Sequence, residues 1–179
     1  IVSWASAHIS ILSSTNNCTV TVKVGDLFKE KGHLVIGIND VFDTEIGDLV
    51  KQNSVQGQFL EKIYKGDLER LNKDIDNQLN EKNLQPILID SSKNKGKNKR
   101  YPVGTTITLG NGTNRYFLSA YSFMGSDLKA KSTINELWIS LSEIWNEVRL
   151  KGQGTKVAIP IVGSELARIS ADRNILIKL

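Results

Sequence analysis

The chain has 179 residues and three prolines, and 40% of its residues are hydrophobic and 23% charged. This length and composition suit one globular domain with a single core and exclude a disordered or collagen-like chain. The single cysteine, Cys18, excludes an internal disulfide framework and fits a reducing compartment, and two scattered histidines give no transition-metal signature. The net charge of +4 weakly favours anionic ligands.

The first twelve residues, IVSWASAHISIL, are apolar but are interrupted by three serines and a histidine. They lack a basic beginning and a methionine start, so a signal peptide is not expected. No segment of the sequence reaches the length of a membrane span. We interpret residues 1–17 as a leading segment or linker from a missing upstream part, and residues 18–179 as the folded domain.

Two strands are predicted near the start of the chain, over residues 9–12 and 18–24. The second strand alternates valine with threonine and lysine, which is the two-residue period of a strand. Gly25 and Asp26 follow it. Asp26 is suited to cap a short helical segment over 27–31, although a Gly-Asp pair is also a common turn.

The segment 34–44, LVIGINDVFDT, joins an apolar run to a polar loop. The run is typical of a strand covered on both faces. Its loop would lie at the carboxyl edge of a sheet, where open α/β sheets bind ligands, with Phe42 as an exposed aromatic. An ordinary strand and turn explains the same residues, because Asn and Asp also suit turns. The polar residues of this loop are Asn39, Asp40, Asp43 and Thr44.

Three helical patterns follow, over residues 45–52, 55–65 and 67–82. Ser54 suits the N-cap of the second helix, and Gly57 in its first turn would let a ligand approach the backbone. A helix N-terminus offers unpaired N–H groups to an anion, although most capped helices bind nothing. The third pattern is amphipathic, and we interpret that helix as scaffold.

An edge strand over 85–90 precedes the basic segment, residues 91–100, with the sequence SSKNKGKNKR. Five of these ten residues are basic and none is apolar, so we predict a mobile surface loop. A nucleic-acid-binding interpretation lacks support, because no aromatic residues are interleaved for base stacking. We interpret the segment as a solvated connection that adds long-range attraction for an anion.

A hairpin is predicted from residues 107–109 and the aromatic-rich 115–122. A long helix over 133–151 follows it, and Thr133 with Glu136 forms a capping box at its start. Its two tryptophans share the helical spacing of its aliphatic residues. We therefore predict that both tryptophan rings lie in the core.

The end of the chain contains a predicted strand over 156–162, a Gly-Ser turn and a helix start over 165–169. This order can hold phosphate on backbone N–H groups, with Arg168 adding charge, but it lacks the lysine of a P-loop. A closing strand is predicted over 174–178. The alternation of strands and helices along the chain indicates an α/β or mixed-sheet layer fold.

Five short sequences, in the order GDLF, VIGINDVFDT, SVQGQF, YPVGTT and VAIPIVGSELARI, resemble those of a macro domain. The chain is most similar to the divergent macro-domain sensors of Thoeris antiphage-defence effectors. The resemblance runs from about residue 20 to the end, so residues 18–179 would form a macro-like ligand-binding domain. It implies a mixed β-sheet flanked by helices on both faces, a three-layer α/β fold, with no cofactor and no metal.

The resemblance also implies which residues bind an ADP-ribose derivative. The acidic residue of GDLF would accept from the adenine amino group, and the loop after the apolar strand would approach the distal ribose. Backbone N–H groups of SVQGQF would face the diphosphate, opposite VGSELAR, and YPVGTT would close the pocket. The implied residues are Asp26, Leu27, Asn39, Asp40, Phe42, Asp43, Thr44, Ser54, Val55, Gln56, Gly57, Tyr101, Gly104, Thr105, Thr106, Gly163, Ser164, Glu165, Leu166, Ala167 and Arg168.

The function that the resemblance implies is a sensor rather than an enzyme. The signal would be an ADP-ribose derivative, such as histidine-ADP-ribose, that a partner TIR-domain protein makes from NAD. Asp40, Asp43 or Glu165 would recognise its amino-acid-like group. The sensor would activate an antiphage effector at the cytoplasmic face of the bacterial membrane, through a missing membrane segment, while this fragment itself is soluble. The resemblance leaves open whether the sensor forms a homo-oligomer on activation, and it implies no binding of nucleic acid.

The alternative function is an ADP-ribosyl hydrolase. The Asn-Ala-Ala-Asn and glycine-rich run of hydrolytic macro domains is absent from this chain, which weakens that interpretation. The VGSELAR segment, which would face the diphosphate opposite SVQGQF, also departs from the family. Gly163, Ser164 and Glu165 replace a glycine-rich sequence there. Glu165 near a diphosphate would repel it unless its side chain points away or contacts a cationic part of the ligand.

Overall fold

The computed structural model describes residues 8–13, 18–112 and 114–162. The chain divides into two compact units, Ile1–Glu30 and Lys31–Leu179. The predicted helix start over 165–169 and the predicted strand over 174–178 lie outside the described residues. The predicted division into residues 1–17 and 18–179 stays a prediction.

The first unit contains a β-hairpin followed by a short helix. Strands β1 (His8–Ser13) and β2 (Cys18–Lys23) pair antiparallel along their whole length. The side chain of Asp26 accepts a hydrogen bond from the Phe28 N–H at 3.0 Å and caps the 3-10 helix η1 (Leu27–Lys29). Both predicted strands and the predicted cap are therefore confirmed.

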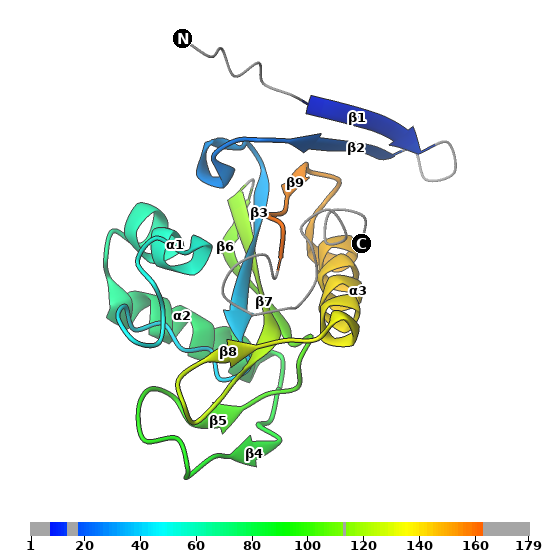
Figure 1. The fold of residues 1–179 in the computed structure, drawn as a ribbon. Coiled ribbons are helices and arrows are strands. Elements are labelled where there is room, and N and C mark those ends of the chain that lie inside the picture. Colours follow the sequence, from blue (N-terminus) through cyan, green and yellow to red (C-terminus); the bar gives the residue numbers. More distant parts are fainter. Residues whose placement is uncertain (1–7, 14–17, 113, 163–179) are drawn as a thin grey trace. The chain divides into compact units, whose positions relative to one another are not determined.

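The second unit is built on a mixed β-sheet, with the strand order β6-β7-β3-β9 and β8 paired to β7 (Figure 1). The central strand β3 runs parallel to β7 and β9, whereas β6 and β8 pair antiparallel with β7. The predicted hairpin is the β6–β7 pair. The strands are β3 (His33–Asn39), β6 (Thr106–Asn111), β7 (Asn114–Met124), β8 (Ala130–Lys131) and β9 (Val157–Ala158).

Strand β3 is buried because it lies between two parallel neighbours and beneath helices. Six of its seven residues are buried, and Gly37 is partly exposed. A Cβ atom at Gly37 would lie 2.5 Å from a ring carbon of Tyr121, so the glycine makes room for that ring. The continuous apolar run thus forms a strand that is covered on both faces of the sheet, as the sequence predicts.

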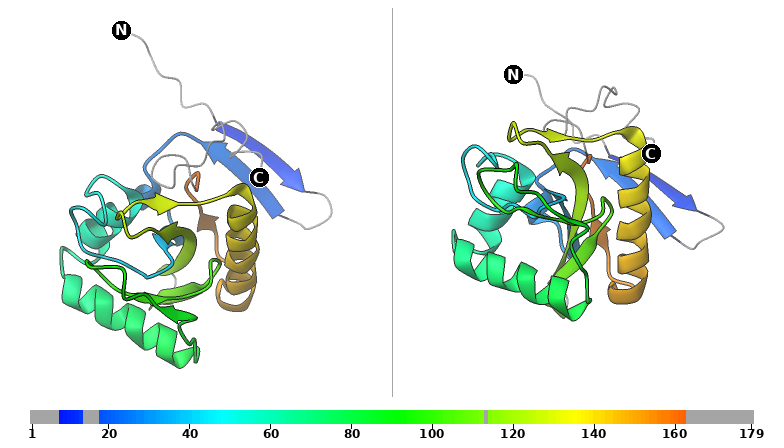
Figure 2. Two further views of the ribbon diagram at one scale, coloured as in Figure 1. Left: turned by 60° about the horizontal axis from the view of Figure 1, so that its bottom comes forward. Right: turned by 90° about the horizontal axis from the view of Figure 1, so that it is seen from below.

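Three helices complete the three-layer arrangement. Helices α1 (Val55–Ile63) and α2 (Leu68–Glu81) lie on one side of the sheet, and α3 (Ile134–Lys151) lies on the other (Figure 1). Figure 2 shows the same layers from two further directions. Among the described residues, no helix combines the length and the apolar character that crossing a bilayer requires. The predicted mixed sheet with helices on both faces is confirmed.

Each helix begins at a polar cap that the sequence indicates. The Ser54 hydroxyl accepts from the Gly57 N–H at 3.0 Å, and Asp67 caps α2 in the same way. At the start of α3, Thr133 accepts from the Glu136 N–H, and the Glu136 carboxylate accepts in return from the Thr133 N–H. The three predicted helices over these segments are confirmed, because capping depends on residues only three positions apart.

Two predicted features of the fold are wrong. Residues 45–52 form turns with an isolated bridge between Ile46 and Val50, because Gly47 has a φ of 132° that a helix cannot contain. The rings of Trp138 and Trp145 are half exposed, at 50% and 49%. The core takes the residues one position earlier, Leu137 and Ile144, which lie about 100° away around the helix.

The basic segment lies at the surface as predicted, with seven of its ten residues exposed, but it is not only a solvated connection. It contributes strand β5 (Lys99–Arg100), which pairs antiparallel with β4 (Leu88–Ile89). Lys93 and Arg100 are buried within the second unit. The prediction fails because a charged side chain can be buried when it is paired with an opposite charge.

Substitution of Gly37 tests the close packing of β3. Gly37→Ala should destabilise the protein by about 1–3 kcal/mol, the usual effect of overpacking, because the new methyl group overlaps the Tyr121 ring. Chemical denaturation of Gly37→Ala, Tyr121→Leu and the double variant measures the effect. The loss from Gly37→Ala should shrink in the Tyr121→Leu background, and an unchanged loss would contradict the predicted contact.

Candidate functional site

The candidate site begins where β3 ends. Asn39 pairs with Ser122 of the parallel strand β7, so the two strands end at the same edge of the sheet. The β3 loop, residues 39–44, follows at this edge. Its four polar residues, Asn39, Asp40, Asp43 and Thr44, are all buried. Their side chains therefore turn inward and bind other parts of the protein.

Asn39 shapes the β3 loop through its own backbone. Its side-chain oxygen accepts hydrogen bonds from the N–H groups of Val41 at 3.2 Å and Asp43 at 3.1 Å. An asparagine that bonds to N–H groups two and four residues ahead holds a tight turn. Asn39 thus has the turn role that the sequence left open.

Asp40 fixes the first half of the loop through a buried ion pair. Its carboxylate accepts from the Arg100 guanidinium at 2.6 Å and from the Met124 N–H at 2.8 Å. Burial raises the pKa of Asp40, while the Met124 N–H and Arg100 act in the opposite direction by favouring the carboxylate. Arg100 also bonds to Asp90 and lies 4.0 Å from the centre of the Phe123 ring.

Asp43 fixes the second half of the loop in a similar way. Its carboxylate lies 3.0 Å from the Lys93 ammonium, and it accepts from the Lys97 backbone N–H at 2.7 Å. The side chains of Asp43 and Lys93 are almost fully buried. Gly96 lets the basic segment pass this close, because a Cβ at that position would overlap the Asp43 carboxylate and the Lys93 ammonium.

Phe42 lies between these two ion pairs and is fully buried, so the prediction of an exposed aromatic is wrong. Its ring packs edge-on against Tyr101, with 5.6 Å between the ring centres. Its φ of 54° is in the left-handed region, which costs a residue with a large side chain about 1–2 kcal/mol. The Asp40 and Asp43 ion pairs on either side hold this strained conformation.

The N-terminus of α1 meets the β3 loop. The Gln56 side chain donates a hydrogen bond to the Asp43 carbonyl oxygen, which ties the first turn of α1 to the loop. Within the described residues, the backbone N–H groups of Val55 and Gln56 make no hydrogen bond. These two groups, with the positive end of the helix dipole, form a local site for an anion.

Gly57 has a structural role that differs from the predicted one. A Cβ at this position would overlap the carbonyl oxygens of Lys51 and Gln52, so the close approach is made by the chain's own backbone. Thr44 also bonds within the protein, because its hydroxyl donates to the Asn72 side chain at 2.7 Å.

The YPVGTT segment divides between two sides of the sheet. The Tyr101 N–H donates to the Asp40 carbonyl oxygen at 2.9 Å, which places Tyr101 at the β3 loop. Gly104 instead faces α3, because a Cβ there would lie 2.9 Å from Ile139. Thr105 bonds to the Pro102 carbonyl oxygen and Thr106 to Ser119. The backbone at Gly104 thus lies close to a helix.

The remaining predicted residues keep their roles as predictions. Asp26 and Leu27 belong to the first unit, where Asp26 caps η1. The residues of the second predicted phosphate loop lie outside the described part of the chain; they are Gly163, Ser164, Glu165, Leu166, Ala167 and Arg168. Among the described residues, no group of three or more His, Cys, Asp or Glu could hold a metal ion.

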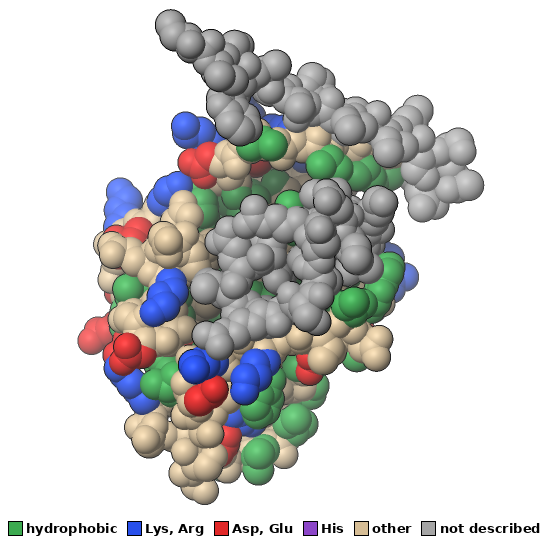
Figure 3. All heavy atoms as spheres, in the orientation of Figure 1, with side chains coloured by type: hydrophobic (Ala, Val, Ile, Leu, Met, Phe, Trp, Pro, Cys, Tyr) green, Lys and Arg blue, Asp and Glu red, His purple; other side chains and the backbone are tan. Residues whose placement is uncertain are grey.

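Sequence reasoning missed Lys93 and Arg100 as partners of the β3 loop. They lie 50 and 60 positions from the acids that they pair with. No local pattern reveals such a pairing. The sequence offered one signal: two acidic residues follow a buried strand, and a segment rich in basic residues occurs later in the chain. On the face in Figure 3, the lysine and arginine side chains are interspersed with acidic and uncharged ones, so no single basic patch stands out there.

Removal of Lys93 tests whether the β3 loop depends on its ion pairs. Lys93→Met should destabilise the protein by about 3–5 kcal/mol, because it leaves the Asp43 carboxylate buried without a counter-charge. Lys95→Met is a matched control, because Lys95 pairs with the exposed Asp48 and such pairs contribute about 1 kcal/mol or less. Urea denaturation measures both, and equal losses would contradict the role given to Lys93.

Comparison with known proteins identifies the family. The chain matches the family model described as the macro domain of the Thoeris protein ThsA, over residues 20–179. The Thoeris protein ThsA of Bacillus amyloliquefaciens (strain Y2) is 26% identical over 167 residues, which cover 89% of this chain and 53% of the relative. The chain therefore spans about half the length of that relative. The predicted resemblance is confirmed, and the chain belongs to the ThsA macro-domain family of Thoeris proteins.

Proposed function

We propose that this domain is a sensor that binds an ADP-ribose-type nucleotide at the carboxyl edge of β3. The observation that carries the proposal is the pair of unbonded N–H groups at the start of α1, beside the β3 loop. Macro domains bind ADP-ribose at this edge of the sheet, which is the reason for choosing this ligand class. The family match supports the choice.

The diphosphate would lie at the N-terminus of α1. The N–H groups of Val55 and Gln56 would donate to phosphate oxygens, and the helix dipole would add roughly half a positive charge. The Gln56 side chain, bonded to the Asp43 carbonyl oxygen, fixes these donors in place before the ligand arrives. Donors that are already in place lose little entropy on binding, which favours affinity.

Other parts of the ligand would meet the remaining predicted residues. Asp26 would accept from the adenine amino group, and the segment from Gly163 to Arg168 would face the diphosphate from the other side. Asp40 and Asp43 would hold the loop rather than contact the ligand, because both already bind cations of the basic segment. Glu165 would then be the acid for an amino-acid-like group.

The wider role is also part of the proposal. The signal would be histidine-ADP-ribose or a related product that a TIR-domain partner makes from NAD, and its binding would activate an antiphage effector. The chain covers 53% of its relative, so the activating step would involve parts of a longer protein. Association with a membrane and assembly into a homo-oligomer would belong to that longer protein.

The geometry supports a sensor better than an ADP-ribosyl hydrolase. Hydrolysis requires a base that can take a proton from water. Asp40 and Asp43, the carboxylates of the β3 loop, are bound to Arg100 and Lys93. A carboxylate that is buried and paired in this way holds structure rather than activating water.

Proline at the first position of α1 tests the phosphate site. Val55→Pro removes one N–H group but suits this position, because proline is favoured there and Ser54 is already extended, with a ψ of 162°. Calorimetry with ADP-ribose and histidine-ADP-ribose should show affinity reduced about 10- to 100-fold, the loss of one hydrogen bond to a charged group.

Ile134→Pro is the matched control, because Ile134 is the first residue of α3 and follows an extended Thr133. It should leave the affinity unchanged, and circular dichroism checks that both variants fold. No heat with either nucleotide on the folded wild-type protein would exclude the proposed function. Unchanged binding by Val55→Pro would place the phosphates away from α1.

A further inference from the structure

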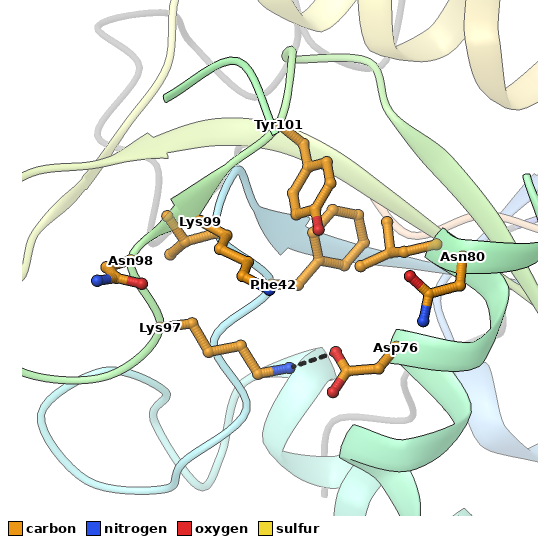
Figure 4. Close-up of a pocket in the computed structure, with 9 residues that line it drawn as sticks. Phe42, Asp76, Asn80, Lys97, Asn98, Lys99 and Tyr101 are labelled. Carbon is orange, nitrogen blue, oxygen red and sulfur yellow. Dashed lines mark ion pairs between the residues drawn. The ribbon is translucent and has the colours of Figure 1, made fainter. Parts of the chain in front are cut away.

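A cavity lies between α2, the β3 loop and the basic segment, and Figure 4 shows it in close-up. Its volume is about 340 Å³, which is within the range of small-molecule sites. Val41, Phe42, Leu79 and Tyr101 form its apolar wall. The phosphate site proposed at α1 does not use this cavity, although Phe42 and Tyr101 of its wall are among the residues that the resemblance implies for the nucleotide.

The ammonium group of Lys97 lies in this cavity without a hydrogen-bond acceptor. Its nitrogen is buried and makes no hydrogen bond to any described residue. The nearest acid is Asp76, at 3.7 Å, which is an ion-pair distance but too long for a hydrogen bond (Figure 4). An ammonium has three N–H donors, and leaving them unmet in a buried place costs free energy.

The backbone of Lys97 is fixed at the β3 loop, whereas its side chain has the long ion pair with Asp76. The backbone N–H of Lys97 donates to the Asp43 carboxylate at 2.7 Å, and that carboxylate is also bound by Lys93. Asp43 is therefore occupied, and the Lys97 side chain extends into the cavity (Figure 4). Burial lowers the pKa of Lys97 more than the nearby Asp76 and Asp43 raise it.

Two further donors face the same space. The Tyr101 hydroxyl and the Asn80 side-chain amide point into the cavity in Figure 4. Neither side chain makes a hydrogen bond within the described part of the chain. Lys99 adds a second positive charge to the lining, whereas Asp76 is the one acid there and is 63% exposed. The lining thus favours an anion over a cation.

We propose that this cavity binds a small organic anion. A carboxylate or phosphate oxygen would accept hydrogen bonds from Lys97, Tyr101 and Asn80, and a compact apolar group or ring would pack against the wall. Its occupant would touch the same loop as the nucleotide. Asp43 separates the two sites, since its carbonyl oxygen accepts from Gln56 of α1 and its carboxylate from the Lys97 N–H.

Titration with two simple anions tests the proposal. Inorganic phosphate and benzoate represent the two sources of the oxyanion, and their binding is followed by amide chemical shifts in NMR spectra. A Kd of about 1 mM is the scale expected for such small probes. Lys97→Gln should weaken binding of the active probe at least about tenfold, because it removes the buried charge.

Lys73→Gln is the matched control, because Lys73 is an exposed lysine of α2 outside the cavity. It should bind the probe as the wild type does. Val55→Pro should weaken phosphate binding only at α1 and should leave the shifts of the amides that line the cavity unchanged. Shifts of the cavity-lining amides that phosphate alone, benzoate alone or both produce identify the oxyanion and support the proposal. Binding of neither probe, or binding that Lys97→Gln leaves intact, overturns it.

A second measurement does not depend on the choice of probe. Without ligand, Lys97→Gln should raise the urea midpoint of unfolding, because it removes a buried ammonium that has no hydrogen-bond acceptor. Lys73→Gln should leave the midpoint unchanged. A lower midpoint for Lys97→Gln would show that the ammonium already stabilises the fold and would contradict an open site.

Discussion

The β3 loop exists in its observed form because two carboxylates are neutralised inside the protein. Asp40 binds Arg100, and Asp43 binds Lys93, and all four side chains are buried. Moving a charge out of water costs several kcal/mol, so neither acid can remain there without its partner. The basic segment therefore supports the edge of the sheet at which the nucleotide site is proposed. It is part of the scaffold, although its composition is that of a surface loop.

Much of the fold follows from local signals in the sequence. Ser54 and the Thr133–Glu136 box mark helix starts, because a cap needs only residues three positions away. The burial of Lys93 and Arg100 has no local signal, since their partners lie 50 and 60 positions away. The prediction that Trp138 and Trp145 lie in the core is wrong for another reason. Helical spacing identifies an apolar stripe on a helix, but it does not say which edge of the stripe faces the core.

The sequence predicted where the candidate site lies, but it did not predict which groups hold the structure and which stay available to a ligand. The sequence located the strand end, the capped helix and Tyr101, and the structure brings these together. It did not show that the acids would face inward while backbone N–H groups stay unbonded. Phe42, strained and buried between the ion pairs, is the point where the wall of the Lys97 cavity meets the loop.

The long separation between the loop acids and their partners has a consequence for synthesis on the ribosome. When the chain has emerged only as far as β3 and the helices α1 and α2, Lys93 and Arg100 are still to come. Asp40 and Asp43 then have no counter-charges and remain hydrated, and β3 still lacks its neighbours β7 and β9, which follow Arg100 in the chain. Closure of the sheet edge awaits contacts between distant parts of the chain, which form slowly. A nascent domain therefore completes this edge of the sheet late.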